Sequence, residues 1–178
     1  MTSEWLDDNH EWLRIADVAW DNPLDPSFAA VVGGRWNPPA SFPVLYLNED
    51  VVTARLNLRA FIANWPYGPE DLRDMAGPVL VSATLPRHQK VADVHTPGGV
   101  EAVGLPATYP HDLEGKVVPH EICQPIGMRI RAAELRGVRC RSARSPSRAE
   151  RELAWFPATS RSVARLIATL SYVEWYWG

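Results

Sequence analysis

The segment from Val31 to Asp50, VVGGRWNPPASFPVLYLNED, places the strongest constraint on how this chain can fold. A pair of glycines and a pair of prolines enclose Arg35 and Trp36, and the hydrophobic run PVLYLN follows closely. Glycines allow backbone conformations that other residues avoid, and prolines stiffen the chain that leaves them. The pattern therefore predicts a rigid loop that fixes Arg35, leading into a buried strand over 43–48. A tight turn with a solvated Arg35 is the alternative for this window.

The rest of the chain shows the patterns of short strands joined by a few helices. Alternating or β-branched runs predict further strands at 12–17, 78–85, 90–94, 137–143 and 151–157. The C-terminal segment SVARLIATLSYVEWYWG fits a strand, a helix followed by a strand, or one long edge strand. Because these elements follow one another irregularly, we expect a mixed α+β fold with a mostly antiparallel sheet and flanking helices.

Two longer helices are also predicted. Asn48 has the residue type of an N-cap, and the acidic residues after it suit the positive end of a helix that runs to about Trp65. The second is expected over 120–135, with Pro125 in its first turn or at a kink. The remaining expectations are a short helix from Ser3 through Asp8, one helical turn within 96–106, and mostly loop over 18–40.

Composition excludes several classes of protein. With 178 residues, 46% of them hydrophobic, the chain is long enough for one domain over 1–178, and its net charge of −3 argues against a general nucleic-acid binder. Cys123 and Cys140 form no CxxC motif, which fits a reducing cytoplasm, and the five histidines lack metal-ligand spacing. We also expect no membrane association, because the acidic N-terminal segment does not resemble a signal peptide and no apolar run reaches membrane-spanning length.

The arginines are concentrated in one part of the chain. Eight of them lie between Arg129 and Arg151, whereas the segment from Glu4 to Asp25 is acidic. A basic segment within an acidic protein fits either a local anion or partner site, or a solvated face.

Five short motifs together resemble the RES-domain family, which is named for an Arg, a Glu and a Ser. They are LRI near the start, GGRWNPP followed by FPVLYL, EAVGLP in the middle, CQPIG on the second long helix and GVRCRSA late in the chain. Members are mostly bacterial toxins of toxin–antitoxin pairs, with a fold related to ADP-ribosyltransferases and an Xre-like antitoxin as partner. The resemblance implies action on NAD, by phosphorolysis, hydrolysis or transfer of ADP-ribose to a protein.

The resemblance also assigns binding roles by position. Arg14 and Arg35 would contact the phosphates of NAD, Tyr46 would lie beside the nicotinamide, and Gln124 would complete the binding site. The residue types suit these roles, because a planar guanidinium can form paired hydrogen bonds to a pyrophosphate and a cationic nicotinamide can stack on an aromatic face. For Tyr46 the alternative is a tyrosine of the hydrophobic core.

The catalytic residues depart from the family pattern. The family glutamate falls eleven residues after Tyr46, where this chain has Asn57, a side chain that forms hydrogen bonds but cannot act as a base. The family serine aligns with Ser142 or, in another alignment, with Glu121. Glu121 could supply the missing carboxylate, or it could be a solvated residue in the first turn of its helix. If position 57 needs a negative charge, Asn57→Glu should raise NAD cleavage.

The resemblance leaves three functions open. The first is an enzyme that cleaves the nicotinamide–ribose bond of NAD as its substrate, without a metal. The second is a catalytically weakened protein that binds NAD, ADP-ribose or an antitoxin, and the third is a protein ADP-ribosyltransferase. The departure at Asn57 separates the first from the second. The oligomeric state is not determined by the sequence.

Overall fold

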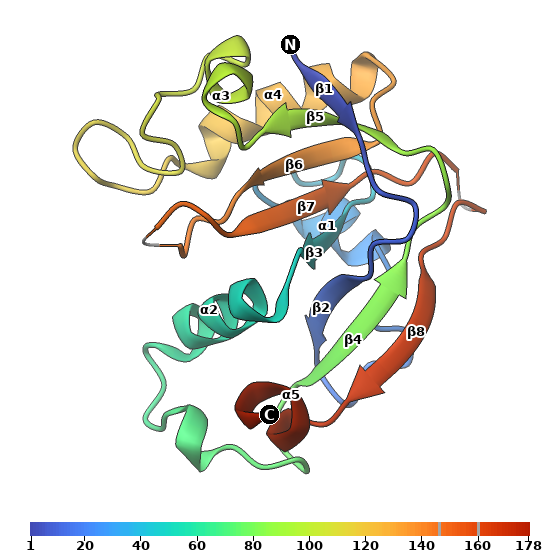
Figure 1. Cartoon of the computed structure of the whole chain (residues 1–178), viewed down its shortest axis with the longest axis vertical. Helices are drawn as coiled ribbons and strands as arrows, with labels where there is room; N and C mark the ends of the chain where they lie inside the picture. Colours follow the sequence, from blue (N-terminus) through green and yellow to red (C-terminus); the bar gives the residue numbers. More distant parts are fainter. Residues whose placement is uncertain (146, 160) are drawn as a thin grey trace.

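The computed structural model describes residues 1–145, 147–159 and 161–178, and its centre is a sheet of eight strands (Figure 1). The order across the sheet is β1-β5-β6-β7-β3-β2-β4-β8. Only β5 and β6 pair in parallel; the other neighbours are antiparallel. The strands are β1 (Ser3–Trp5), β2 (Trp12–Ala16), β3 (Leu45–Asn48), β4 (Val79–Thr84), β5 (Lys90–Val94), β6 (Gly137–Arg141), β7 (Arg151–Trp155) and β8 (Arg165–Leu170). This confirms the expected mixed α+β fold.

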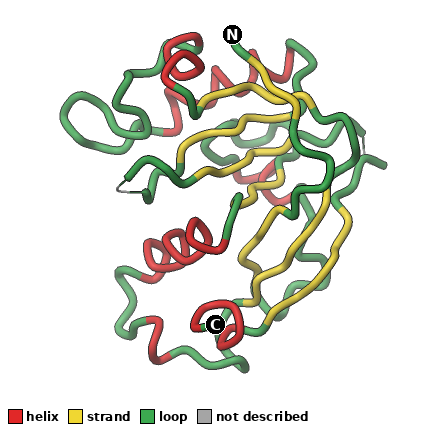
Figure 2. The backbone as a smooth tube through the Cα atoms, viewed as in Figure 1, coloured by secondary structure: helices red, strands yellow, loops and turns green. Residues whose placement is uncertain are grey.

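Helices flank both ends of the sheet in the part of the chain that the structure describes. They are α1 (Ser27–Val32), α2 (Val51–Ile62), α3 (Pro97–Ala102), α4 (His120–Ala132) and α5 (Tyr172–Trp177), with one 3-10 turn at Pro69–Asp71. Helices α3 and α4 pack against β5 and β6, and α2 and α5 pack against β2 and β4 (Figure 2). No helix in the described ranges is long and apolar enough to cross a membrane.

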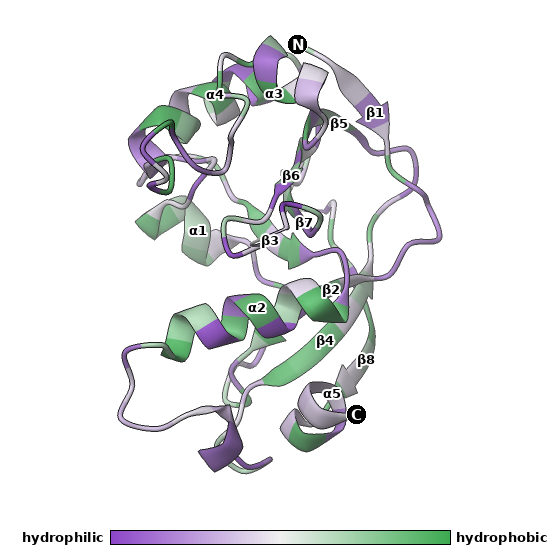
Figure 3. Cartoon of the chain, turned by 60° about the vertical axis from the view of Figure 1, so that its left-hand side comes forward, coloured by the Kyte–Doolittle hydropathy of each residue, from purple (hydrophilic) through white to green (hydrophobic). Residues whose placement is uncertain are grey.

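Three groups of buried side chains hold these layers together. One lies under α3 and α4 and includes Trp36, Ile130 and Val138; another lies among the central strands around Trp155. The third joins α2 to β4 and α5 and includes Leu58. The alternation of hydrophobic and hydrophilic residues along α2 is visible in Figure 3. Full burial of one leucine of this kind stabilises a fold by about 1.5–3 kcal/mol.

The expected N-terminal helix from Ser3 to Asp8 is wrong, because Ser3–Trp5 forms the edge strand β1. Glu4 lies opposite Val91 of β5. The backbone groups of this short segment are satisfied by the neighbouring strand rather than within a helical turn. Such a long-range partner leaves no mark in a local pattern.

Three smaller expectations also need correction. The N-cap of α2 is Asp50, whose carboxylate accepts a hydrogen bond from the Thr53 backbone N–H at 2.7 Å. Asn48 is instead the last residue of β3, and α2 ends at Ile62 rather than near Trp65. The C-terminal segment forms a strand followed by a helix, an order that was not among the three considered.

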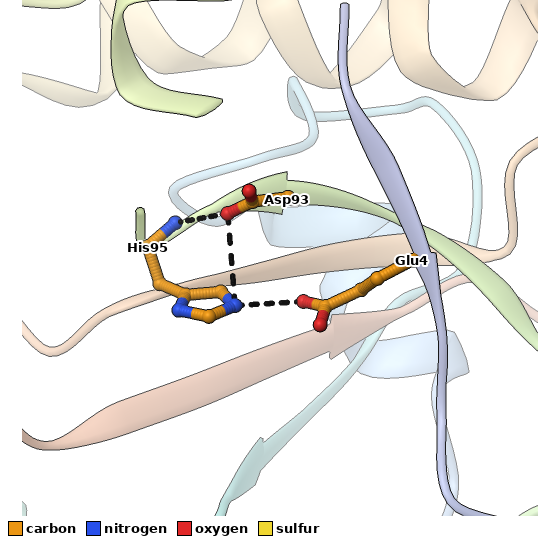
Figure 4. A group of neighbouring side chains, drawn as sticks. All are labelled: Glu4, Asp93 and His95. Atoms are coloured by element: carbon orange, nitrogen blue, oxygen red, sulfur yellow. Dashed lines mark hydrogen bonds and ion pairs between the residues drawn. The ribbon is translucent and has the colours of Figure 1, made fainter. Parts of the chain in front are cut away.

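A cluster of charged side chains holds β1 against β5 and β6. Three of its members, Glu4, Asp93 and His95, are drawn in Figure 4. His95 Nε2 lies 2.8 Å from Glu4 Oε1, and Arg139 Nη1 donates to Glu4 Oε2 at 3.1 Å. Asp93 accepts hydrogen bonds from the backbone N–H groups of His95 and Thr96, each at 3.0 Å, and from the Thr96 hydroxyl. The carboxylate oxygens are thus occupied by protein donors, and Arg139 adds a positive charge. The cluster is better explained as a structural link than as a cation site.

The Asp93 carboxylate gives this link a pH dependence. Burial alone would raise its pKa, but the hydrogen bonds from Thr96 and His95 outweigh burial and place the pKa below the ordinary value of 3.8. The charged form therefore stabilises the folded state above about pH 3.8, and this contribution is lost as the pH falls through the lowered pKa.

We expect Asp93→Asn to be less stable than the wild type at neutral pH, with the difference shrinking below about pH 3.8. Urea denaturation of both proteins at pH 7 and at pH 3 measures the difference. A difference in free energy of unfolding that stays the same at both values would contradict this account.

Candidate functional site

Three neighbouring cavities run along one side of β2 and β3. A polar cavity of about 250 Å³ is lined by Arg14, Tyr46, Asn57 and Glu152, among others. A second, of about 320 Å³, shares Arg14 and Tyr46 with it and adds Arg35. A third, of about 390 Å³, shares Asn57 with the polar cavity and is lined mostly by apolar and aromatic side chains of α2 and of the loop after β2.

Arg14 projects from β2 and lines both of the first two cavities. Among the described residues no carboxylate or carbonyl accepts a hydrogen bond from its guanidinium, which instead lies over the ring of Trp20, 5.5 Å from the centroid. Burial lowers the pKa of Arg14, and the charge of Asp25 opposes that effect. A half-buried cation without a partner is costly for a protein to maintain, so the site favours an anionic ligand.

Arg35 lies in the loop predicted to hold it. Its Nη1 donates to the Val118 carbonyl at 2.9 Å and lies 3.9 Å from Cys123 Sγ, which fixes the side chain and leaves other guanidinium donors available. His120, at the start of α4, lines the same cavity. Burial and the charge of Arg35 both lower the pKa of His120, which favours the neutral imidazole.

Tyr46 holds this loop, residues 33–42, against β3. Its hydroxyl accepts a hydrogen bond from the Trp36 backbone N–H at 2.9 Å and donates to Asn37 Oδ1 at 2.8 Å. Burial raises the pKa of Tyr46, so the hydroxyl keeps the proton that it donates. A side chain at Gly34 would collide with this hydroxyl, which explains the glycine there. Tyr46 therefore fixes the position of the loop by two hydrogen bonds and also lines the cavities.

Gln124 contacts the same loop from the other side. Its Nε2 donates to the Gly34 carbonyl at 3.0 Å, and it does not line the cavities that contain Arg14 and Arg35. One helical turn further, Gly127 brings the backbone of α4 close to the Trp36 carbonyl. The structure thus gives Gln124 a role in positioning the loop; direct binding of NAD by this side chain stays a prediction.

Asn57 and Ser142 converge on a carboxylate that was not predicted from the sequence, that of Glu152. Asn57 Nδ2 donates to Glu152 Oε1 at 2.9 Å and to Asn48 Oδ1 at 2.7 Å. The Ser142 hydroxyl donates to the same oxygen of Glu152 at 2.6 Å and accepts from the Arg144 backbone N–H at 3.2 Å. Helix α2, strand β7 and the segment after β6 therefore meet at one carboxylate oxygen.

The sequence contained one signal for Glu152. In the strand sequence RELAW, Glu152 and Ala154 alternate with larger apolar residues, so a carboxylate is placed on one defined face of the sheet. Its importance depends on register, because Glu152 lies opposite Asn48 on β3. That pairing is not readable from the strand alone.

Glu121 lies apart from this group. It is exposed in the first turn of α4 and lines none of the three cavities. The structure therefore brings Arg14, Arg35, Tyr46 and Asn57 to the walls of these adjoining cavities. Ser142 is buried behind the wall and hydrogen-bonded to Glu152, Gln124 lies behind the loop, and Glu121 lies outside the cavities.

The fold is thus a mostly antiparallel sheet with arginine-lined cavities beside it. Residues 10–178 match the RES domain, so the chain belongs to the RES-domain family. Comparison with curated proteins gives no match. Among solved structures, a chain of the M. tuberculosis MbcT–MbcA toxin–antitoxin complex is similar in fold, with a TM-score of 0.72 and 22% identity over 95% of this chain and 90% of that chain.

The contact between α4 and the loop predicts a specific effect of Gly127→Ala. The added methyl group would collide with the Trp36 carbonyl, so either α4 or the loop must move. We expect the variant to lose about 1–3 kcal/mol of stability, as overpacked sites do. Chemical denaturation measures the loss.

Gly98→Ala in α3 is the matched control, because its new methyl group would meet no atom within 4 Å. The control should be as stable as the wild type or more so, since alanine favours a helix over glycine. Equal stability of Gly127→Ala and wild type would show that the helix and the loop are not tightly packed.

Proposed function

We propose that this protein cleaves the nicotinamide–ribose bond of NAD, with Arg14 and Arg35 holding the pyrophosphate. The observation that supports this most is the guanidinium of Arg14, which has no polar partner among the described residues yet borders the cavity that contains Arg35. Two planar cations at one cavity suit two linked phosphates. Membership of the RES-domain family agrees with NAD as the substrate.

Tyr46 would then place its ring beside the nicotinamide. Its hydroxyl is already used by Trp36 and Asn37, so the ring face, and not the hydroxyl, is what it offers to a ligand. A cationic ring is attracted to an aromatic face. The bond to be cleaved would lie in the polar cavity near Asn57, with Ser142 acting from behind the cavity wall.

We further propose that the partner is an antitoxin protein of the Xre-like type and that the protein acts in the cytoplasm. A chain of similar fold comes from a toxin–antitoxin complex, and the buried free thiols of Cys123 and Cys140 suit a reducing compartment. The acceptor of the ADP-ribose group would be water, inorganic phosphate or a protein.

The test is to incubate the purified protein with NAD, with and without phosphate, and to measure released nicotinamide. Arg35→Ala should weaken binding of ADP-ribose by about 1.5–3 kcal/mol, the range for a hydrogen bond to a charged group, and Arg14→Ala should have a similar effect. Arg35→Lys should recover only part of this loss, since an ammonium cannot form the planar fork. Calorimetry gives the affinities.

Arg87→Ala is the control, because Arg87 is exposed in the turn before β5 and away from the cavities. Equal affinity of all the variants would refute the phosphate roles. A wild-type protein that binds NAD but releases no nicotinamide would instead be a binding protein.

A further inference from the structure

We infer that Glu152 supplies the carboxylate that this chain lacks at position 57, so that the charge has moved from helix α2 to strand β7. The inference rests on the proposed function, because it concerns the same reaction. Its starting point is a distance: Glu152 Oε1 lies 2.9 Å from Asn57 Nδ2, so the carboxylate reaches the place where the family glutamate is expected.

Hydrogen bonds to Asn48 and Glu152 fix the orientation of the Asn57 amide. Both hydrogens of the Asn57 amide are used, one on Asn48 Oδ1 and one on Glu152 Oε1. Asn48 Nδ2 in turn donates to the Leu13 carbonyl at 3.3 Å, so the direction of donation is set from the backbone of β2. Asn57 therefore acts as a donor toward Glu152 and is a positioning residue.

Glu152 keeps one oxygen free for a ligand. Oε1 accepts from Asn57 and from Ser142, whereas Oε2 accepts no hydrogen bond from any residue that the structure describes. The side chain is half-buried in the wall of the polar cavity that also contains Arg14 and Tyr46. A carboxylate that lines a cavity, is oriented by two donors on one oxygen and has its second oxygen without a donor among the described residues is preorganised to face a developing positive charge.

The reaction explains why a carboxylate is useful here. When the bond between C1′ of the ribose and N1 of the nicotinamide breaks, its electron pair leaves with N1 and the nicotinamide becomes neutral. Positive charge then develops on C1′ and the ring oxygen of the ribose, and Glu152 would stabilise it. An oxygen of water or phosphate forms the new bond to C1′; an attacking water passes one proton to Glu152, which releases it to solvent.

This arrangement reverses the effect expected for Asn57→Glu from the sequence. A glutamate at 57 would replace a donor with a second carboxylate beside Glu152, and two carboxylates at this distance cannot both ionise readily. We now expect Asn57→Glu alone to lower activity. Combined with Glu152→Gln, it would return a single carboxylate to the site, with an amide as its partner.

The test compares nicotinamide release by four variants with that of the wild type. Glu152→Gln keeps the shape and the acceptor for Ser142 but removes the charge, and should lower kcat by about 100-fold or more. Asn57→Glu should also lose activity, and the double variant should be at least about tenfold faster than Glu152→Gln, because the lost charge is replaced. Glu114→Gln, at an exposed ion pair with Lys116, is the control and should match the wild type.

A binding measurement separates failure of this inference from failure of the proposed function. Calorimetry with carba-NAD, whose nicotinamide is cationic and cannot be cleaved off, and with NADH, whose nicotinamide is neutral, gives a preference for the cationic ring. The wild type should show this preference and Glu152→Gln should lose most of it, whether or not the protein turns NAD over. If thermal melting shows that Glu152→Gln does not fold, Glu152→Asp is measured in its place. This variant retains the charge on a shorter side chain, so it should keep the preference for the cationic ring.

Two results would overturn the inference. One is a Glu152→Gln variant with wild-type kcat and an unchanged preference for carba-NAD. The other is loss of activity in Glu121→Gln with Glu152→Gln unaffected, which would place the carboxylate on α4. Absence of turnover in the wild type, with the preference lost in Glu152→Gln, would refute the enzyme but retain Glu152 as the group that faces the cationic ring.

Discussion

The pair of hydrogen bonds at the Tyr46 hydroxyl is the interaction on which the rest of the site depends. It joins the central strand β3 to the loop that carries Arg35, at a point where any residue larger than Gly34 would collide with the Tyr46 side chain. The buried side-chain amide of Asn37 adds to this network, because it donates hydrogen bonds to the carbonyls of Ala29 and Phe42. An arginine held in this way needs little reordering when an anion arrives, so less affinity is lost to conformational entropy.

The charges of the site are separated along its length. Arg35 provides positive charge at the cavity bounded by the loop, Glu152 provides negative charge at the polar cavity next to α2, and Arg14 lies between them and lines both. A dinucleotide with an anionic pyrophosphate and a cationic nicotinamide has the complementary distribution. In the proposed complex, this distribution of charge would favour one direction of the ligand over the reverse, in addition to contributing to its affinity.

The elements that could be predicted are those whose pattern is local. The strands over 43–48 and 78–85 follow from their hydrophobic runs, and the structure places them at Leu45–Asn48 and Val79–Thr84. The loop around Arg35 follows from its glycines and prolines. The strand at Ser3–Trp5 and the contacts of Glu152 could not be predicted, because each depends on a partner from another part of the chain: β5 for the first, Asn57 and Ser142 for the second.

The order of strands in the sheet also determines when the site can exist. Strand β3, from the first third of the chain, lies between β2 and β7, and β7 comes from the last part of the sequence. The ribosome therefore synthesises the two neighbours of β3, which are β2 and β7, at very different times. Strand β7, which carries Glu152, cannot pair with β3 before residue 152 has left the ribosome. Contacts of such long sequence separation form late and slowly in folding. A growing chain therefore contains Arg14 and Arg35 well before it contains the complete polar cavity. A chain that stops before β7 lacks Glu152 and so cannot form that cavity.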